Sequence, residues 1–126
     1  MSLSECRVEA IIAVSDMETA KAFYENKLGL SSGEDAGDGG RTYDCGGGTR
    51  FHVYPSPGNA GKSGATQAGW QVDDVEATVD ELAHNGVIFE QYGDPFNTNS
   101  KGIAEMGESK TAWFKDPDGN ILAIGN

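Results

Sequence analysis

Three polar side chains with the chemistry of an active site stand in segments whose pattern otherwise predicts apolar β-strands: Glu9, His52 and Gln67. A carboxylate and an imidazole can pass protons to and from a bound substrate. Together with the amide oxygen of Gln67 they could also hold a divalent ion, although a neutral amide is a weak ligand. Less specific interpretations stay open, because Glu9 can pair with Arg7 or Arg50 and a lone histidine is more often hydrogen-bonded structure.

Side chains suited to contact with an organic ligand accompany these three: Tyr54, Gln71 and Trp113. Aromatic rings offer a surface for stacking, and glutamine offers both donors and acceptors of hydrogen bonds. Aromatic residues in strands are usually part of a core, so both roles stay open for Tyr54 and Trp113.

Glu9 and Gln67 hold matching positions in an internal repeat, which identifies the elements that must place them. The segment from Glu9 to Glu18 aligns without a gap with the segment from Gln67 to Glu76. Four positions are identical: Ala10 and Ala68, Val14 and Val72, Asp16 and Asp74, Glu18 and Glu76. A repeat of this kind predicts two copies of one supersecondary unit.

Each copy begins with a strand that leads into a helix. The strands are expected at residues 8–14 and 66–72. Ser15-x-x-Glu18 and Asp73-x-x-Glu76 then have the pattern of capping boxes, which satisfy the free amides of a first helical turn. Apolar residues at helical spacing follow, and the helices are expected to end at Gly29 and at Asn85-Gly86, which tolerate positive φ.

Shorter strands complete each copy. They are expected near residues 29–35, 41–45 and 50–54, and near residues 87–92, 103–115 and 120–124. The best-defined bend between them is Asp116-Pro-Asp-Gly-Asn120, whose proline and glycine favour a tight turn. The irregular stretch from Gly93 to Gly102 is long enough to form a lip over a site.

The whole chain is therefore predicted to be one domain, with a first module at about residues 5–54, a linker at about 55–65 and a second module at about 66–126. Strand alternation separates two faces in each opening strand. The apolar sets, expected to pack against a helix, are Val8, Ala10, Ile12 and Val14, and Ala68, Trp70 and Val72. The opposite sets, expected to face a ligand, are Glu9, Ile11 and Ala13, and Gln67, Gly69 and Gln71.

Composition narrows the partners. A formal net charge of -11 would repel a phosphate backbone, so no nucleic-acid partner is expected. No apolar run is long enough for a membrane span and the first residues lack the pattern of a signal peptide, so we expect a cytoplasmic protein without a membrane partner. Cys6 and Cys45 are too few for a disulfide scaffold and are expected to be reduced.

Three segments together resemble the vicinal oxygen chelate superfamily, which includes glyoxalase I, bleomycin-resistance proteins and extradiol dioxygenases. They are Val14 to Tyr24, Val72 to Leu82, and Ala112 to Asn120. The resemblance implies an α+β fold in which two βαβββ modules in tandem form curved mixed sheets around a cleft. It also implies a homodimer and a cleft that commonly holds a divalent metal.

The family's metal ligands would correspond to Glu9, His52, Gln67 and Ala123, and the methyl group of Ala123 cannot coordinate an ion. The resemblance therefore favours a glyoxalase/bleomycin resistance/dioxygenase-like protein that binds a small organic ligand in the inter-module cleft without a metal or other cofactor. Ligand contacts are expected from Glu9, His52, Tyr54, Gln67, Gln71 and Trp113, with Glu9 or His52 as the acid-base group of any reaction.

A divalent-metal-dependent lyase or isomerase of the glyoxalase type is the alternative. Glu9, His52 and Gln67 would hold its ion, and Glu105 would replace the missing fourth ligand. An extradiol dioxygenase is disfavoured, because that resemblance would require two histidines and a carboxylate. One version of the metal-free protein is a resistance-type binder that attracts a cationic aromatic antibiotic by charge and stacking.

Overall fold

The chain folds into two βαβββ modules of the same design, which confirms the predicted α+β class. The computed structural model describes residues 2–31 and 33–126, and Ser32, inside the predicted strand 29–35, lies outside the described residues. Module one contains η1 (Leu3–Glu5), β1 (Glu9–Val14), α1 (Met17–Lys21), η2 (Ala22–Lys27), β2 (Glu34–Asp35), β3 (Arg41–Asp44), η3 (Gly46–Gly48) and β4 (Arg50–Pro55). Module two contains β5 (Thr66–Gln71), α2 (Val75–His84), β6 (Ile103–Met106), β7 (Ser109–Lys115) and β8 (Ile121–Gly125).

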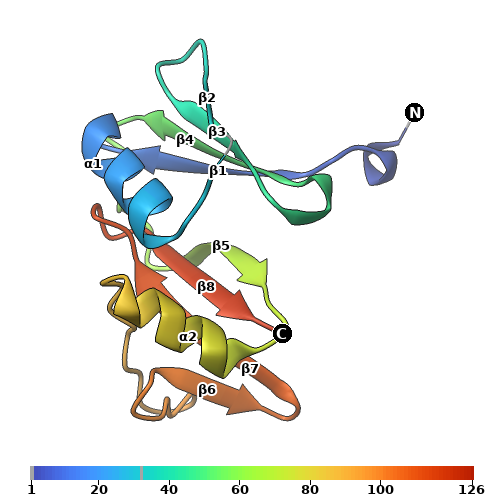
Figure 1. Ribbon diagram of the computed structural model, residues 1–126, viewed down its shortest axis with the longest axis vertical. Coiled ribbons are helices and arrows are strands. Elements are labelled where there is room, and N and C mark those ends of the chain that lie inside the picture. Colours follow the sequence, from blue (N-terminus) through green and yellow to red (C-terminus); the bar gives the residue numbers. More distant parts are fainter. Residues whose placement is uncertain (1, 32) are drawn as a thin grey trace.

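The two sheets have the same strand order and the same mixture of directions (Figure 1). Sheet A runs β1-β4-β3-β2 and sheet B runs β5-β8-β7-β6. The opening strand of each module pairs in parallel with the last strand, while the remaining pairs are antiparallel. The repeat seen in the sequence is thus a repeat of topology.

Three of the predicted strands differ from those observed. Of the predicted strand 29–35, only Glu34 and Asp35 form a strand among the described residues. Residues 87–92 form no ladder, and only Phe89 makes an isolated bridge to Phe114, because its side chain packs on the core without a strand neighbour. The predicted strand 103–115 is a hairpin of β6 and β7, since Gly107 has a φ of 66° and turns the chain there. Because the hairpin supplies two strands, module two still has three strands after α2.

Both helices begin one residue later than the capping boxes suggest. The carboxylate of Asp16 accepts from the amides of Glu18 and Thr19, and that of Asp74 accepts from the amide of Ala77. The caps are thus the aspartates that the repeat shares, and their carboxylates also complement the helix dipole. The ends are as predicted, with φ of 77° at Gly29 and 100° at Gly86.

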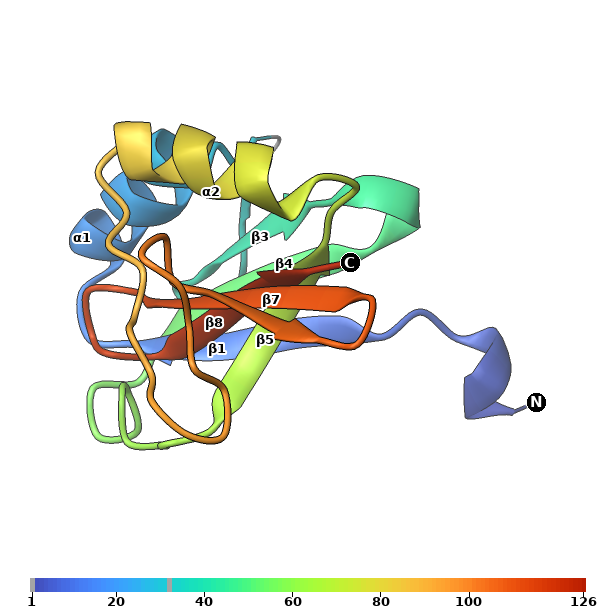
Figure 2. The ribbon, with the colours of Figure 1, turned by 90° about the horizontal axis from the view of Figure 1, so that it is seen from below.

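One apolar core joins the two modules. The rings of Phe51 in β4 and Trp70 in β5 stack with centroids 5.1 Å apart, so the helix-side faces of the two sheets meet there. The predicted apolar sets lie on these faces, except Val8, whose side chain precedes β1 and is 83% exposed. Figure 2 shows both helices on one side of the molecule, above the strands.

The opposite face of each sheet, called here its outer face, therefore points away from the core. Because the helix-side faces contact one another, the two outer faces are directed to different sides of the chain. Figure 1 shows sheet B broadside behind α2, whereas sheet A lies across the top of the molecule, above α1. Neither helix within the described residues has the length and apolar character needed to cross a bilayer.

The turn between β7 and β8 fastens module two to module one. The buried carboxylate of Asp116 accepts from the hydroxyl of Tyr24 at 2.7 Å and from the side-chain amide of Asn120 at 2.8 Å. The same amide donates to the carbonyl of Ala13 in β1 at 2.8 Å. Ser15, displaced from the expected capping role, donates its amide to Asp118 at 3.0 Å. This turn is the best-defined bend of the sequence, and its polar side chains fix the relative position of the modules.

Candidate functional site

The outer face of sheet A carries two rows of polar side chains. In the register of β1, β4 and β3, Glu9 lies opposite Arg50 and Arg50 opposite Asp44. One step along the strands, Ile11 lies opposite His52 and His52 opposite Thr42. Alternation in β4 places Tyr54 on the same face, and its ring stacks on that of His52 with centroids 6.2 Å apart. The expected contacts His52 and Tyr54 thus lie on the same face as Glu9.

His52 is held from both sides. Its Nε2 lies 2.7 Å from Oδ2 of Asp38 and its Nδ1 lies 2.8 Å from the hydroxyl of Thr42. An ionised carboxylate only accepts, so Nε2 carries the proton and Nδ1 accepts from Thr42. This hydrogen bond, followed by one from the amide of Gly40, lowers the pKa of Asp38 below its usual value. The imidazole is oriented by Asp38 and Thr42, and it must release Thr42 before Nδ1 can take a proton from a substrate.

Carboxylates outnumber cations at the neighbouring end of this face. The guanidinium of Arg50 lies 4.0 Å from Glu9, 3.8 Å from Glu34 and 3.4 Å from Asp44. Three carboxylates around one cation leave this end of the face negative. Glu9 thus has the Arg50 partner that the less specific interpretation named, and its side chain is still 40% exposed.

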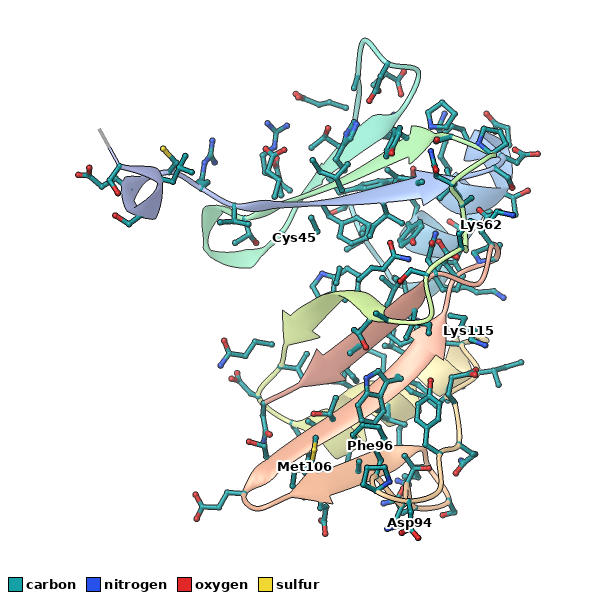
Figure 3. The ribbon with its side chains drawn as sticks, turned by 180° about the vertical axis from the view of Figure 1, so that it is seen from behind. Cys45, Lys62, Asp94, Phe96, Met106 and Lys115 are labelled. Carbon is teal, nitrogen blue, oxygen red and sulfur yellow. The ribbon has the colours of Figure 1, made fainter. Side chains whose placement is uncertain are left out.

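The outer face of sheet B is aromatic. The ring of Trp113 contacts Tyr92 with centroids 5.4 Å apart and Phe96 with centroids 4.9 Å apart. Across the sheet Trp113 lies opposite Ala123, and Ala123 lies opposite Gly69, so the indole has only small neighbours on that side. Figure 3, a view from behind, shows Phe96 with Met106 on the side of sheet B turned away from α2.

Tyr92 and Phe96 were not among the expected contacts. Phe96 belongs to the stretch from Gly93 to Gly102 that was predicted to form a lip, and Tyr92 precedes it. Their aromatic character within such a stretch was the available signal. That stretch does fold over sheet B, because the ring of Phe96 rests on Trp113.

Gln67 and Gln71 lie together with Glu9 at a third location, the seam between the two modules. A cavity of about 630 Å³ between the modules is lined by these three residues together with Cys45 and Arg50, among others. The side-chain amide of Gln67 donates to Asn120 at 3.1 Å, which ties it to the turn that fastens the modules. His52, Tyr54 and Trp113 are not part of the lining of this cavity. One chain thus distributes the six expected contacts over two outer faces and the seam between the modules.

The residues present do not fit a divalent metal. Among the described residues no group of three or more His, Cys, Asp and Glu side chains is placed to hold an ion. Of the family positions, both ring nitrogens of His52 are engaged, the oxygen of Gln67 is a neutral and weak ligand, and Ala123 has no donor atom. If two chains contributed these positions to one site, Glu9 would still be the one strong ligand among them that makes no hydrogen bond to a neighbouring side chain within the described residues.

Glu105 cannot supply the missing ligand. It lies two residues after buried Ile103 and therefore shares the helix side of β6 with it. Lys110, which lies 4.0 Å from Glu105, is bonded to Glu76 of α2 at 2.6 Å. The carboxylate of Glu105 is thus directed away from the outer face. The expectation that it replaces the fourth ligand is wrong, because a two-residue period fixes its side.

Comparison with known proteins gives one family. The model of the Glyoxalase/Bleomycin resistance protein/Dioxygenase superfamily matches residues 7–124. A search of curated proteins finds no match. Similar solved structures include a glyoxalase family protein from Enterococcus faecalis, with 18% identity, a TM-score of 0.67, and coverage of 98% of this chain and 99% of that one.

Two further similar structures come from Streptomyces sp. CB03234. One is a glyoxalase/bleomycin resistance protein, with 23% identity, a TM-score of 0.63, and coverage of 94% of this chain and 100% of that one. The other is TnmS3, described as an antibiotic binding protein, with 22% identity, a TM-score of 0.64, and coverage of 95% of each chain. At these low identities, the TM-scores show a shared fold.

Proposed function

This chain belongs to the glyoxalase/bleomycin resistance protein/dioxygenase superfamily, and we propose that it binds a small cationic aromatic molecule without a metal. The observation that carries this proposal is the aromatic cluster of Tyr92, Phe96 and Trp113 on the outer face of sheet B. The ligand's ring would stack on Trp113 beneath the lip, and its cation would be attracted by the acidic outer face of sheet A.

The cluster has the properties of a binding surface. Trp113 is 8% exposed beneath a Phe96 that is 38% exposed, so a movement of the lip uncovers the indole. The small neighbours Ala123 and Gly69 leave room beside it for a flat molecule. Aromatic faces attract cations as well as rings, which suits a ligand that carries both. The description of TnmS3 as an antibiotic binding protein agrees with such a ligand.

A homodimer would bring the two outer faces together. In one chain they are directed to different sides, so Trp113 and His52 cannot contact one small ligand. Both faces expose apolar side chains, with Ile11 61%, Phe96 38% and Met106 45% exposed. A twofold axis would place sheet A of one copy against sheet B of the other and form two equal clefts. Covering these side chains would also supply a hydrophobic contribution to association.

Direct binding measurements test the proposal. We would titrate the protein by calorimetry with a panel of cationic aromatic dyes and amines, and repeat the titration with Trp113→Ala. We expect loss of about 1–3 kcal/mol of binding free energy, the usual contribution of one stacking partner. Ile88→Ala is the matched control, because it removes an exposed apolar side chain that lies outside both sheets. Equal affinities of Trp113→Ala and the unchanged protein would contradict the proposal.

Metal dependence and the dimer need their own measurements. Elemental analysis of protein purified without chelator, followed by calorimetry with zinc, nickel and manganese, should show no stoichiometric ion. A bound ion that is lost in Glu9→Ala would instead support the metal-dependent lyase or isomerase.

The dimer is tested by sedimentation. It should give a dimer that Ile11→Glu weakens, since this variant places a buried charge at the proposed interface. A monomer that binds ligand equally well would refute the shared cleft.

A further inference from the structure

A second cavity lies on the opposite side of sheet B, away from the Trp113 cluster. It has a volume of about 280 Å³ and is bounded by residues 28–30 of module one, by α2, and by the helix-side faces of β5 and β8. Figure 1 shows α2 and the chain leaving the first helix on the same side of sheet B. Because sheet B separates this cavity from Trp113, a molecule inside it would not touch the proposed outer-face site.

The floor of the cavity is formed by two rings of an aromatic stack. Trp70 lies between Phe51, at 5.1 Å and 27° between ring planes, and Phe114, at 6.4 Å and 15°. Phe51 and Phe114 are buried, whereas Trp70 is only partly buried and lines the cavity together with Phe114. Leu28 and Leu82 add apolar walls. A flat ring entering the cavity would therefore pack against the accessible part of Trp70 and bury apolar surface.

The rim of the cavity offers hydrogen-bond acceptors. Thr78, Glu81 and Asn85 lie along one face of α2. The side-chain amide of Asn85 donates to the carbonyl of Lys27 at 3.2 Å, which leaves its oxygen for a ligand. The carboxylate of Glu81 is exposed and makes no ion pair with any residue in the ranges 2–31 and 33–126. A carboxylate beside an aromatic face matches a protonated amine on an aromatic body.

The volume of this cavity limits the size of the ligand that it could hold. Pockets for drug-sized ligands usually measure about 300–1,000 Å³, so this cavity suits a single fused ring with a short chain. We propose that it is a binding site for a compact aromatic amine, whose ring packs against the accessible part of Trp70 and whose ammonium group is held by Glu81. This site goes beyond the proposed function, because neither Glu81 nor Thr78 belongs to the outer faces.

The two tryptophans allow a direct test with tryptamine as the probe. In ¹⁵N-labelled protein each indole N–H gives one signal, and Trp113→Phe assigns the two. Tryptamine should shift the Trp70 signal in a saturable way. Indole, which lacks the amine, should bind more weakly, and indole-3-acetate, which carries a negative charge, should bind least. A shift of the Trp113 signal alone would overturn this inference while leaving the proposed function intact.

Variants of α2 separate this cavity from the 630 Å³ cavity, which Trp70 also lines. Glu81→Gln should weaken tryptamine about fivefold, the upper range for a solvent-exposed ion pair, and leave indole unchanged. Glu108→Gln, which removes an exposed carboxylate from the β6–β7 turn, is the matched control. Thr78→Leu should fill the cavity and abolish the Trp70 shift in a chain with unchanged thermal stability. Unaltered tryptamine affinity in both Glu81→Gln and Thr78→Leu would refute the site.

Discussion

Replacing Tyr24 by phenylalanine tests whether the β7–β8 turn fastens the two modules. The hydroxyl of Tyr24 is one of four donors to the buried Asp116 carboxylate, with the side-chain amide of Asn120 and the backbone amides of Asp118 and Asn120. Tyr24 is fully buried, so water cannot replace the lost donor. Hydrogen bonds to charged groups contribute about 1.5–3 kcal/mol, and we expect Tyr24→Phe to lower the free energy of unfolding by about 2 kcal/mol. For a chain of this length that corresponds to a fall in Tm of roughly 8 °C.

The pH dependence of that difference gives a second, independent measurement. Burial, followed by the nearby Asp116 carboxylate, raises the pKa of Tyr24 far above its ordinary value. Above about pH 10 the unfolded chain releases this proton and the folded chain keeps it, so the stability falls as the pH rises. The Tyr24 contribution is fully present below about pH 10 and is lost as the pH rises towards the folded pKa. The stability gap between the unchanged protein and Tyr24→Phe should therefore narrow by up to about 1.4 kcal/mol per pH unit above pH 10.

Urea unfolding followed by circular dichroism between pH 7 and pH 11 measures both effects. Tyr54→Phe is the matched control, because the Tyr54 hydroxyl makes no hydrogen bond within the described part of the chain and its ring is only half-buried. It should change the stability by less than about 0.5 kcal/mol. A Tyr24→Phe protein as stable as this control, or a gap that does not narrow at alkaline pH, would refute the role of the turn.

Three further predictions follow from the same structure. Gly61→Ala should cost more than about 2 kcal/mol in urea unfolding, because Gly61 has a φ of 66° and a Cβ there would collide with a carbonyl of the β7–β8 turn; Gly58→Ala, in open space at ordinary φ, should cost less than about 1 kcal/mol. In a carbon-detected NMR titration, His52→Ala should return the lowered pKa of Asp38 towards its ordinary value, because the largest cause of the shift is the hydrogen bond from His52; an unchanged titration would contradict the hydrogen bond. Glu105→Gln should leave the binding of a ligand or metal ion at the outer faces unchanged in calorimetry, because its side chain lies on the helix side of sheet B.

The placement of individual residues shows how far sequence reasoning reaches. The match between Glu9 and Gln67 located both opening strands, and β4 places His52 and Tyr54, which were both expected contacts, on the outer face of sheet A. Strand alternation, applied to β6, would have excluded Glu105 from the site. The hairpin at Gly107 was missed, because a single glycine beside charged residues gives a weaker turn signal than the run from Asp116 to Asn120.

The sequence by itself determined the modules, because strand and helix periods, caps and turns depend on residues close together along the chain. Only the tertiary structure decided which way each outer face points. That direction depends on contacts between distant residues, above all Phe51 with Trp70 and Tyr24 with Asp116. These contacts turn the helix-side faces towards each other and therefore separate His52 from Trp113, although both lie on the outer face of their own sheet.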